Sequence, residues 1–449
     1  MVAPAVTVIA TVVAVLTVAD KNNLKNRSDP AGRSYFFDKI QLMLQQLSNP
    51  SRKSFPHQFW LMFWGLLLSS SGASMIWPFL LIYINGKLNM PLTAVSTLIT
   101  INAVSSVISS FLAGPVADRF GRKGVMVLSL LADAALFLLM IQASDYLTFA
   151  ILMAARGFFN PLYRVGADAM LADLVPAEDR AEAYALIRMI SNAGIAIGPA
   201  VGGFLAATSY SLAFYAAAVG MGTYGVLLAL FARETLQKTT QNKDEKKKTE
   251  WFGGYDRVLG DMAFTPIIGI MMFGWITATL MWILMPIYAN ANFGVPENLY
   301  GWIPTTNALL VVSLQILVTR KTRHYETRRM MSIGMLLYAL ANGVVALATG
   351  FWGFWFAMVI MTVGELVIVP TSSTYVANIA PADMRGRYMS IYGLTWSFGQ
   401  MFGPILGGLL NDNLGPRFIW IGGLTIGLIS AFGLYVLSRQ VLKPKPSAN

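Results

Sequence analysis

The stretch Gly194-Ile-Ala-Ile-Gly-Pro-Ala-Val-Gly-Gly203 returns 205 residues later as Gly399-Gln-Met-Phe-Gly-Pro-Ile-Leu-Gly-Gly408. Five of its ten positions are identical in the two copies. Upstream, Pro176 and Arg180 recur at the same offset as Pro381 and Arg385. Seven matches of turn-forming, small and charged residues at one offset indicate that the chain consists of two halves with the same plan. Parallel halves of this kind, with a binding site between them, are a known plan of membrane transporters.

The composition of the whole chain is that of a membrane protein. The chain is 55% hydrophobic and 12% charged, whereas an ordinary soluble domain is about 25% charged. Its apolar residues form segments of about 20 residues, the length of a helix that crosses a bilayer. We predict an all-α polytopic membrane protein with spans at residues 58–84, 91–113, 124–143, 146–172, 181–206 and 209–232, and at 262–288, 296–319, 329–350, 352–376, 386–410 and 417–438.

The basic residues predict the orientation of these spans. Of 33 Lys and Arg residues, 28 fall in segments that alternate on one side, and only Lys87 and Arg417 fall on the other. Cytoplasmic loops of membrane proteins carry such an excess. We therefore expect a multi-pass protein of the cytoplasmic (inner) membrane, with the central linker and the C-terminus in the cytoplasm. We therefore attribute the net charge of +11 to basic residues at the membrane surface and expect no nucleic acid partner.

The same pattern divides the chain into five parts. The first is an N-terminal extension, in which residues 1–19 form either an extra span or a simple extension. Phe36, Ile40, Met43, Leu44 and Leu47 of this part have the spacing of a helix on the membrane surface. The predicted parts are residues 1–57, a first six-helix bundle at 58–232, a cytoplasmic linker at 233–261, a second six-helix bundle at 262–438, and a tail at 439–449.

Residue usage excludes several functions. There is no cysteine, and the two histidines, His57 and His324, lie in predicted cytoplasmic segments. Disulfides, thiolate metal sites and a histidine relay within the membrane are therefore excluded. The spans contain no nucleophile–base pair and no phosphate-binding loop, so we expect neither an enzyme nor a nucleotide-driven pump. No cofactor and no metal are expected. The expected partners of a monomer are a small-molecule substrate, protons and membrane lipid.

A loop motif lies between the second and third spans, Gly114-Pro-Val-Ala-Asp118-Arg119-Phe-Gly121-Arg122-Lys123. Its glycines permit a tight turn, and its bases suit an anionic membrane surface. The motif resembles the signature loop of the major facilitator superfamily, and the resemblance covers residues 58 to about 440. It implies two six-helix bundles related by pseudo-twofold symmetry. It also implies a gate in which Asp118 and Arg122 join Asp173 to close the cytoplasmic side. In the second half the motif is degraded to a basic turn.

The small residues Gly194, Gly198, Pro199, Gly202 and Gly203 form a second motif. Small residues four apart let another helix approach closely, so simple helix packing is one interpretation. The pattern also resembles the antiporter motif of drug–proton exporters in the same superfamily. That resemblance implies export by antiport.

Charged residues inside the spans are candidates for function, because they are costly in hydrocarbon. Asp133 and Arg156 lie at middle depth on neighbouring helices, as a coupling pair or as a structural ion pair. By the family resemblance, Arg156 matches an arginine that couples proton and substrate. Away from the span ends, Glu365 is the sole charged residue of the second-half spans. Its surroundings, Gly364-Glu365 and then Pro370, resemble a motif of multidrug antiporters. We predict Glu365 as the main proton site and Asp133 as the second.

Two further groups complete the prediction. Arg164, Asp168, Arg188 and Asn192 lie nearer the cytoplasmic ends and are interpreted as an inner polar network. Trp64, Asn160, Trp275 and Trp282 are candidates for the substrate cavity, since aromatic side chains suit varied apolar ligands. The competing interpretation of the tryptophans is anchoring at the membrane interface or helix packing.

The sequence thus predicts a proton-coupled secondary exporter of amphipathic or lipophilic small molecules, including drugs, that works by alternating access. The alternative is an importer or facilitator of a polar nutrient, such as a sugar or a peptide. The seventh span argues against this alternative, because it offers few polar side chains beyond Thr277 and Thr279.

Overall fold

The computed structural model describes residues 55–176, 179–236, 255–381 and 384–439. Within these ranges the regular secondary structure is helical throughout, which confirms the all-α prediction. The predictions for residues 1–19, for the surface helix around Phe36, for the charged run of the linker and for the tail lie outside the described residues.

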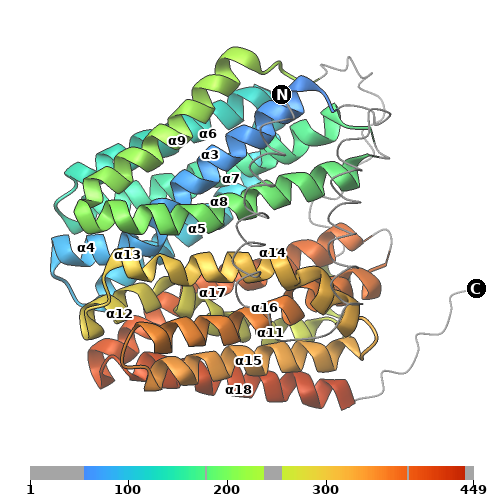
Figure 1. Ribbon diagram of the computed structural model, residues 1–449. Coiled ribbons are helices and arrows are strands. Elements are labelled where there is room, and N and C mark those ends of the chain that lie inside the picture. The colour runs from blue at the N-terminus through green and yellow to red at the C-terminus, as the bar shows by residue number, and fades with distance from the viewer. Residues whose placement is uncertain (1–54, 177–178, 237–254, 382–383, 440–449) are drawn as a thin grey trace, which may run out of the picture. The chain divides into compact units, whose positions relative to one another are not determined.

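Each predicted span coincides with helix, although the ends differ by a few residues. The first half consists of α3 (His57–Ile76), η1 (Trp77–Phe79), α4 (Leu80–Leu88), α5 (Leu92–Phe120), α6 (Arg122–Gln142), α7 (Tyr146–Leu174), α8 (Arg180–Thr208) and α9 (Tyr210–Phe231). The second half consists of α10 (Tyr255–Leu259), α11 (Thr265–Ile283), α12 (Met285–Phe293), α13 (Glu297–Tyr300), α14 (Trp302–Thr322), α15 (Thr327–Leu347), α16 (Phe351–Ile379), α17 (Arg385–Leu414) and α18 (Phe418–Arg439). The long helices of each half lie together in Figure 1.

Ten of the described helices, with η1–α4 and α13 counted as part of their neighbours, are long and apolar enough to cross a membrane. Helices α7 and α17 have the length but not the apolarity. Polar residues such as Arg156 and Asn160 interrupt α7, and α17 is rich in glycine. These two helices therefore rely on their neighbours for burial, as polar transmembrane helices do.

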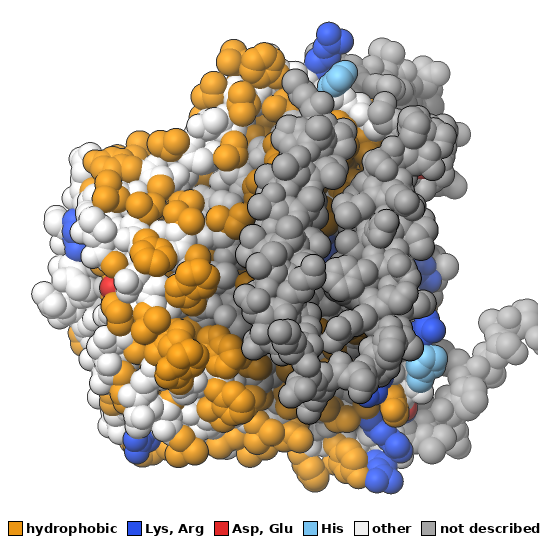
Figure 2. Space-filling model, in the orientation of Figure 1, with side chains coloured by type: hydrophobic (Ala, Val, Ile, Leu, Met, Phe, Trp, Pro, Cys, Tyr) orange, Lys and Arg blue, Asp and Glu red, His pale blue; other side chains and the backbone are white. Residues whose placement is uncertain are grey.

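The surface agrees with a membrane location. Large apolar side chains are exposed on several helices, among them Phe111, Leu147 and Phe432, each more than 60% exposed. Figure 2 shows apolar side chains spread over the visible helical surface and Lys and Arg near its margins. An apolar outer surface with charges at its margins is what a lipid environment requires.

The two bundles meet through contacts that obey the 205-residue repeat. Thr100 of α5 donates to the Met401 carbonyl of α17 at 2.6 Å. Its equivalent, Thr305 of α14, donates to the Ala196 carbonyl of α8 at 2.7 Å. Both donors and both acceptors are 205 residues apart. These two hydrogen bonds across the interface are therefore related by the repeat.

Close backbone approach reinforces this interface. A Cβ atom on Gly408 would lie 2.6 Å from Thr93 Cα, and one on Gly203 would lie 2.4 Å from the Glu297 carbonyl oxygen. Asp412 accepts hydrogen bonds from the backbone N–H groups of Leu92 and Thr93 and from the Thr93 hydroxyl. We call the end of the helices where Thr93, Glu297 and Asp412 lie the outer end, because the Lys and Arg distribution predicts that it faces away from the cytoplasm. The outer half of the helices contains hydrogen bonds between the two bundles, donated by Leu92, Thr100, Tyr210 and Thr305.

Candidate functional site

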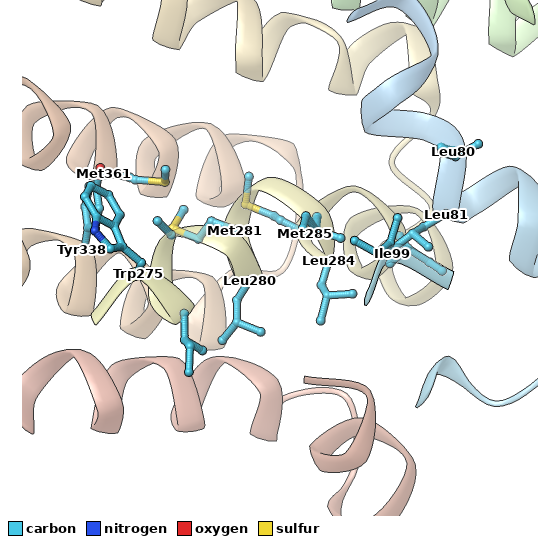
Figure 3. Packing of buried hydrophobic residues seen from close by; sticks show 14 of the residues in the cluster. Leu80, Leu81, Ile99, Trp275, Leu280, Met281, Leu284, Met285, Tyr338 and Met361 are labelled. Atoms are coloured by element: carbon cyan, nitrogen blue, oxygen red, sulfur yellow. The ribbon is translucent and has the colours of Figure 1, made fainter. Parts of the chain in front are cut away.

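A cavity of about 280 Å³ lies within the second bundle. The residues that line it belong to α11, α15, α16 and α17, and most of these residues are aromatic. The lining residues are Trp275, Trp282, Tyr338, Glu365, Val369, Tyr392, Gly393, Thr395 and Trp396. Figure 3 shows Trp275 and Tyr338 beside each other, with Met361 of α16 and Met281 of α11 nearby. Of the predicted cavity residues, Trp275 and Trp282 line this space.

Glu365 supplies the carboxyl group of the cavity. Its Oε2 atom accepts a hydrogen bond from the Asn307 side chain of α14 at 2.8 Å. Asn307 is 4% exposed and donates a second hydrogen bond to the Thr362 hydroxyl at 2.9 Å. The carboxyl group of Glu365 is therefore fixed from the side of α14 while it borders the cavity. A carboxyl group in such a place can hold a cationic group or a proton.

Other polar groups surround this carboxyl group. Arg188 of α8, from the first bundle, interacts with Glu365 electrostatically, and so does Tyr338 of α15. The Tyr392 hydroxyl lies 2.7 Å from the Ser372 hydroxyl. Trp275 has a buried indole N–H without a hydrogen-bond partner among the described residues. The cavity thus combines one carboxyl group and hydroxyl groups with aromatic walls.

Asp133 and Arg156 form a separate buried cluster in the first bundle. Asp133 is 2% exposed and accepts a hydrogen bond from Asn160 at 3.2 Å. Arg156 interacts with Asp133 electrostatically, and its guanidinium lies 5.1 Å from the ring of Trp77 and 4.9 Å from that of Phe137. Such cation–π contacts stabilise a charge where water is excluded. The predicted pair thus interacts, and the cluster lies outside the cavity that holds Glu365.

The gate motif lies where α5 ends and α6 begins. Arg122 forms the predicted ion pair with Asp173 at the end of α7. Asp118 is exposed and, within the described ranges, makes no ion pair or hydrogen bond. Arg119 is exposed beside Phe120. The resemblance therefore predicted the Arg122–Asp173 contact, whereas Asp118 joins neither residue within the part of the chain that the structure describes.

Glu234, just beyond α9, completes this turn and was not predicted. Its carboxylate accepts hydrogen bonds from the backbone N–H groups of Arg122 and Lys123, the first residues of α6. Partial burial acts to raise the pKa of Glu234, but these two donors and two further backbone N–H groups outweigh it, so the pKa lies below its usual value. Gly121 has φ +88°, and a Cβ atom there would lie 2.4 Å from Glu234 Oε2. An acidic residue directly after a span was the available signal.

The antiporter motif serves helix packing in this structure. A Cβ atom on Gly194, Gly198 or Gly202 would lie between 1.9 and 2.5 Å from atoms of α3. The carbonyl of Pro199 lies against Gly301, and Gly203 lies against α13, both in the second half. The motif thus joins α8 to α3 on one side and to the second bundle on the other. Its role in antiport stays a prediction.

The remaining predicted residues are distributed over both bundles. Arg164 and Asp168 interact electrostatically, and the Tyr184 hydroxyl donates to the Asp168 carbonyl oxygen at 3.2 Å. Asn192 has no hydrogen bond within the described ranges. Trp64 is 41% exposed and does not line the cavity. The inner polar network stays a prediction; its member Arg188 interacts electrostatically with Glu365.

Known proteins identify the family. The sequence profile of the Major Facilitator Superfamily matches residues 62–290 and 267–449. The chain belongs to this superfamily. An Na(+), Li(+), K(+)/H(+) antiporter of Planococcus maritimus is 27% identical over 80% of this chain and 89% of its own length. Multidrug resistance protein MdtH of Escherichia coli O1:K1 is 26% identical over 73% of this chain and 80% of its own length.

A solved structure supports the fold. A POT family transporter in complex with 5-aminolevulinic acid superposes with a TM-score of 0.70 at 16% identity, covering 85% of this chain and 96% of its own. The predicted major facilitator fold is thus confirmed, and the protein is a multi-pass membrane transporter and not an enzyme. A likeness at this identity carries the fold and not the substrate.

Proposed function

We propose that the protein is a proton-coupled secondary exporter of amphipathic or lipophilic small molecules. The observation that carries this proposal is Glu365, a carboxyl group held by Asn307 at the wall of an aromatic cavity. Aromatic walls offer large apolar contact area and favourable faces for cations. A single carboxyl group among them can exchange a proton for a cationic substrate. The relatives with antiporter and multidrug resistance names support this direction.

The proposed cycle uses the contacts between the bundles. With the outer contacts made, the cavity takes up substrate from the cytoplasm and Glu365 releases its proton there. Loss of those contacts then exposes the cavity on the other side, where substrate leaves and Glu365 is protonated again. Each proton that moves inward supplies about 2.3 kcal/mol per 100 mV of membrane potential. Substrate is thus moved outward at the expense of the proton gradient.

The test is transport in proteoliposomes. Liposomes that contain the purified chain and a trapped pH-sensitive dye receive an imposed pH gradient and then tetraphenylphosphonium or ethidium. We expect substrate-dependent proton movement by the native chain and none by Glu365→Gln. The control Asp256→Asn removes an exposed carboxyl group of α10 and should transport normally. Full proton-coupled transport by Glu365→Gln would contradict the assignment.

A second candidate function is exchange of a monovalent metal cation for protons, which the Planococcus maritimus relative suggests. The aromatic lining argues against it, since alkali cations are bound by rings of oxygen atoms. The same liposomes distinguish the two, because pulses of NaCl or KCl then replace the organic cation. Import of a polar nutrient is the remaining alternative and would appear as uptake of the solute together with protons.

A further inference from the structure

Asn307 has an equivalent in the first bundle, Asn102, which lies 205 residues earlier. The Asn102 side chain donates to the Met153 carbonyl of α7 at 3.0 Å. Gly157, one turn further along α7, makes room for this approach, because a Cβ atom there would lie 2.2 Å from the Asn102 carbonyl oxygen. Asn102 thus joins α5 to α7 through a backbone acceptor, which is a packing contact.

The second bundle does not allow the same contact. The equivalent carbonyl is that of Met358, and it already accepts a hydrogen bond from the Thr362 hydroxyl at 2.7 Å. Thr362 stands at the position equivalent to Gly157. Asn307 therefore meets a hydroxyl group where Asn102 meets a backbone carbonyl, and its side chain is released from the packing role.

Thr362 also determines which way the Asn307 amide points. A hydroxyl group has one proton, and that of Thr362 is used on Met358. Its oxygen can only accept from Asn307, so the NH₂ group of Asn307 faces α16. The second N–H of this group then points at Glu365. Asn307 is therefore a donor to Glu365, not an acceptor from it.

A donor of this kind favours the charged carboxylate over the neutral acid. Arg188 of α8 and Tyr338 of α15 also interact with Glu365 electrostatically. From α17, Tyr392 lines the same cavity. From α11 the cavity receives tryptophans, which do not titrate. Asn307 is the neighbour that touches the carboxyl oxygen directly, and its burial keeps water from taking its place.

We propose that Asn307 is the positioning residue of the proton site: it holds the Glu365 carboxylate against α14 and sets the pH at which that carboxylate is protonated, with Thr362 fixing the amide. This inference rests on the proposed function, in which Glu365 carries the proton. Two residues earlier on α14, Thr305 bonds to the Ala196 carbonyl of the first bundle. One helix thus joins the proton site to the contact between the bundles.

Infrared spectra of the purified chain in lipid bilayers, recorded across a pH series, test the inference without any substrate. The protonated Glu365 carboxyl is the band that Glu365→Gln removes. Asn307→Ala is expected to move the midpoint of this band upward by about one pH unit, the effect of one charge-assisted hydrogen bond. The matched control Asn102→Ala removes the equivalent side chain of the first bundle and should leave the midpoint in place.

Thr362→Val is an independent second variant that keeps side-chain shape. It frees the Met358 carbonyl, to which Asn307 can then turn, as Asn102 does to Met153. The midpoint should move in the same direction as in Asn307→Ala. An unchanged midpoint in both variants would overturn the inference and leave Glu365 as the proton site. A carboxyl band that keeps its full size in Glu365→Gln would instead contradict the proposed function.

Discussion

At the scale of single residues, the two bundles cap equivalent helices, α6 and α15, with carboxylates from different positions in the chain. Helix α6 begins after Gly121, and its first N–H groups are capped by Glu234, which follows the last helix of the first bundle in the sequence. In the repeat, Gly121 corresponds to Glu326, which caps α15 itself through the N–H groups of Arg328 and Arg329. The degraded second motif thus keeps the carboxylate cap and loses the long-range partner.

Glu234→Ala should lower the free energy of unfolding by about 1 kcal/mol at pH 7, the usual value of a helix cap. Because the pKa of Glu234 is depressed in the folded chain, this contribution is complete above the ordinary glutamate pKa of about 4.3. It disappears as the pH falls through the lower folded-state value. Thermal unfolding in detergent at several pH values measures the difference. Asp256→Asn serves as control, and equal melting temperatures of Glu234→Ala and the native chain at pH 7 would refute the cap.

Between elements, α5 and α17 are joined across the interface of the two bundles by a side-chain cap. The N-terminus of α5 follows Pro91 and has no side-chain cap from its own bundle. Asp412 of α17 takes that place across the interface. The residue equivalent to Asp412 in the first half is Ala207, which cannot accept such bonds. At the outer end, the contacts of Thr100 and Thr305 between the bundles are therefore symmetric, whereas the contact of Asp412 occurs once.

Asp412→Ala should weaken the contact between the two bundles at the outer end. Hydrogen bonds to a charged group are worth about 1.5–3 kcal/mol. Their loss corresponds to at least roughly a tenfold rise in the population of molecules in which the outer ends of the bundles have separated. The chain has no cysteine, so spin labels on Leu147→Cys and Phe418→Cys report one distance between the bundles. We expect a larger population at long distance in Asp412→Ala. Asn413→Ala, whose side chain bonds only within α17, is the matched control. Identical distance distributions in the two variants would count against the role of Asp412.

For the whole molecule, the repeat predicts paired effects. Gly203 meets the backbone at Glu297 and Asn298, and Gly408 meets the backbone at Leu92 and Thr93. These contacts are equivalent at the 205-residue offset. An added methyl group at either glycine has no flexible neighbour to displace, so either should separate the bundles at the outer end.

We therefore expect Gly203→Ala and Gly408→Ala to lengthen the Leu147–Phe418 label distance to a similar extent. Gly386→Ala is the control, because a Cβ atom at Gly386 meets open space. Overpacking of this kind typically costs about 1–3 kcal/mol. If only one of the two substitutions changed the distance, the equivalence of the contacts would be wrong.

The same repeat explains what the sequence could and could not predict. Glycines at helix crossings and at the Gly121 turn have few substitutes, so their pattern in the sequence indicated the two-bundle fold. The apolar segments predicted the helices, and the resemblance of the loop motif implied the Arg122–Asp173 contact. The role of Asn307 depends on Thr362 having already taken the Met358 carbonyl, a competition that exists only once the helices are packed. Glu234 acts on a turn 112 residues away in the chain. Trp64 and Trp275 are both tryptophans in predicted spans, yet only packing against Tyr338 and Trp396 brings Trp275 to the cavity.

The burial of Arg156 also bears on how the chain enters the membrane. Helix α7 is too polar to partition into lipid unaided, and its arginine lies between rings supplied by η1 and α6. An unpaired arginine at the centre of a helix opposes insertion by about 2.5–3.5 kcal/mol. We expect α7 to wait at the translocation channel until α6 and its Asp133 are beside it, so that the two leave for the bilayer as one hairpin. An arginine placed for the folded state thus also sets an order of events during synthesis.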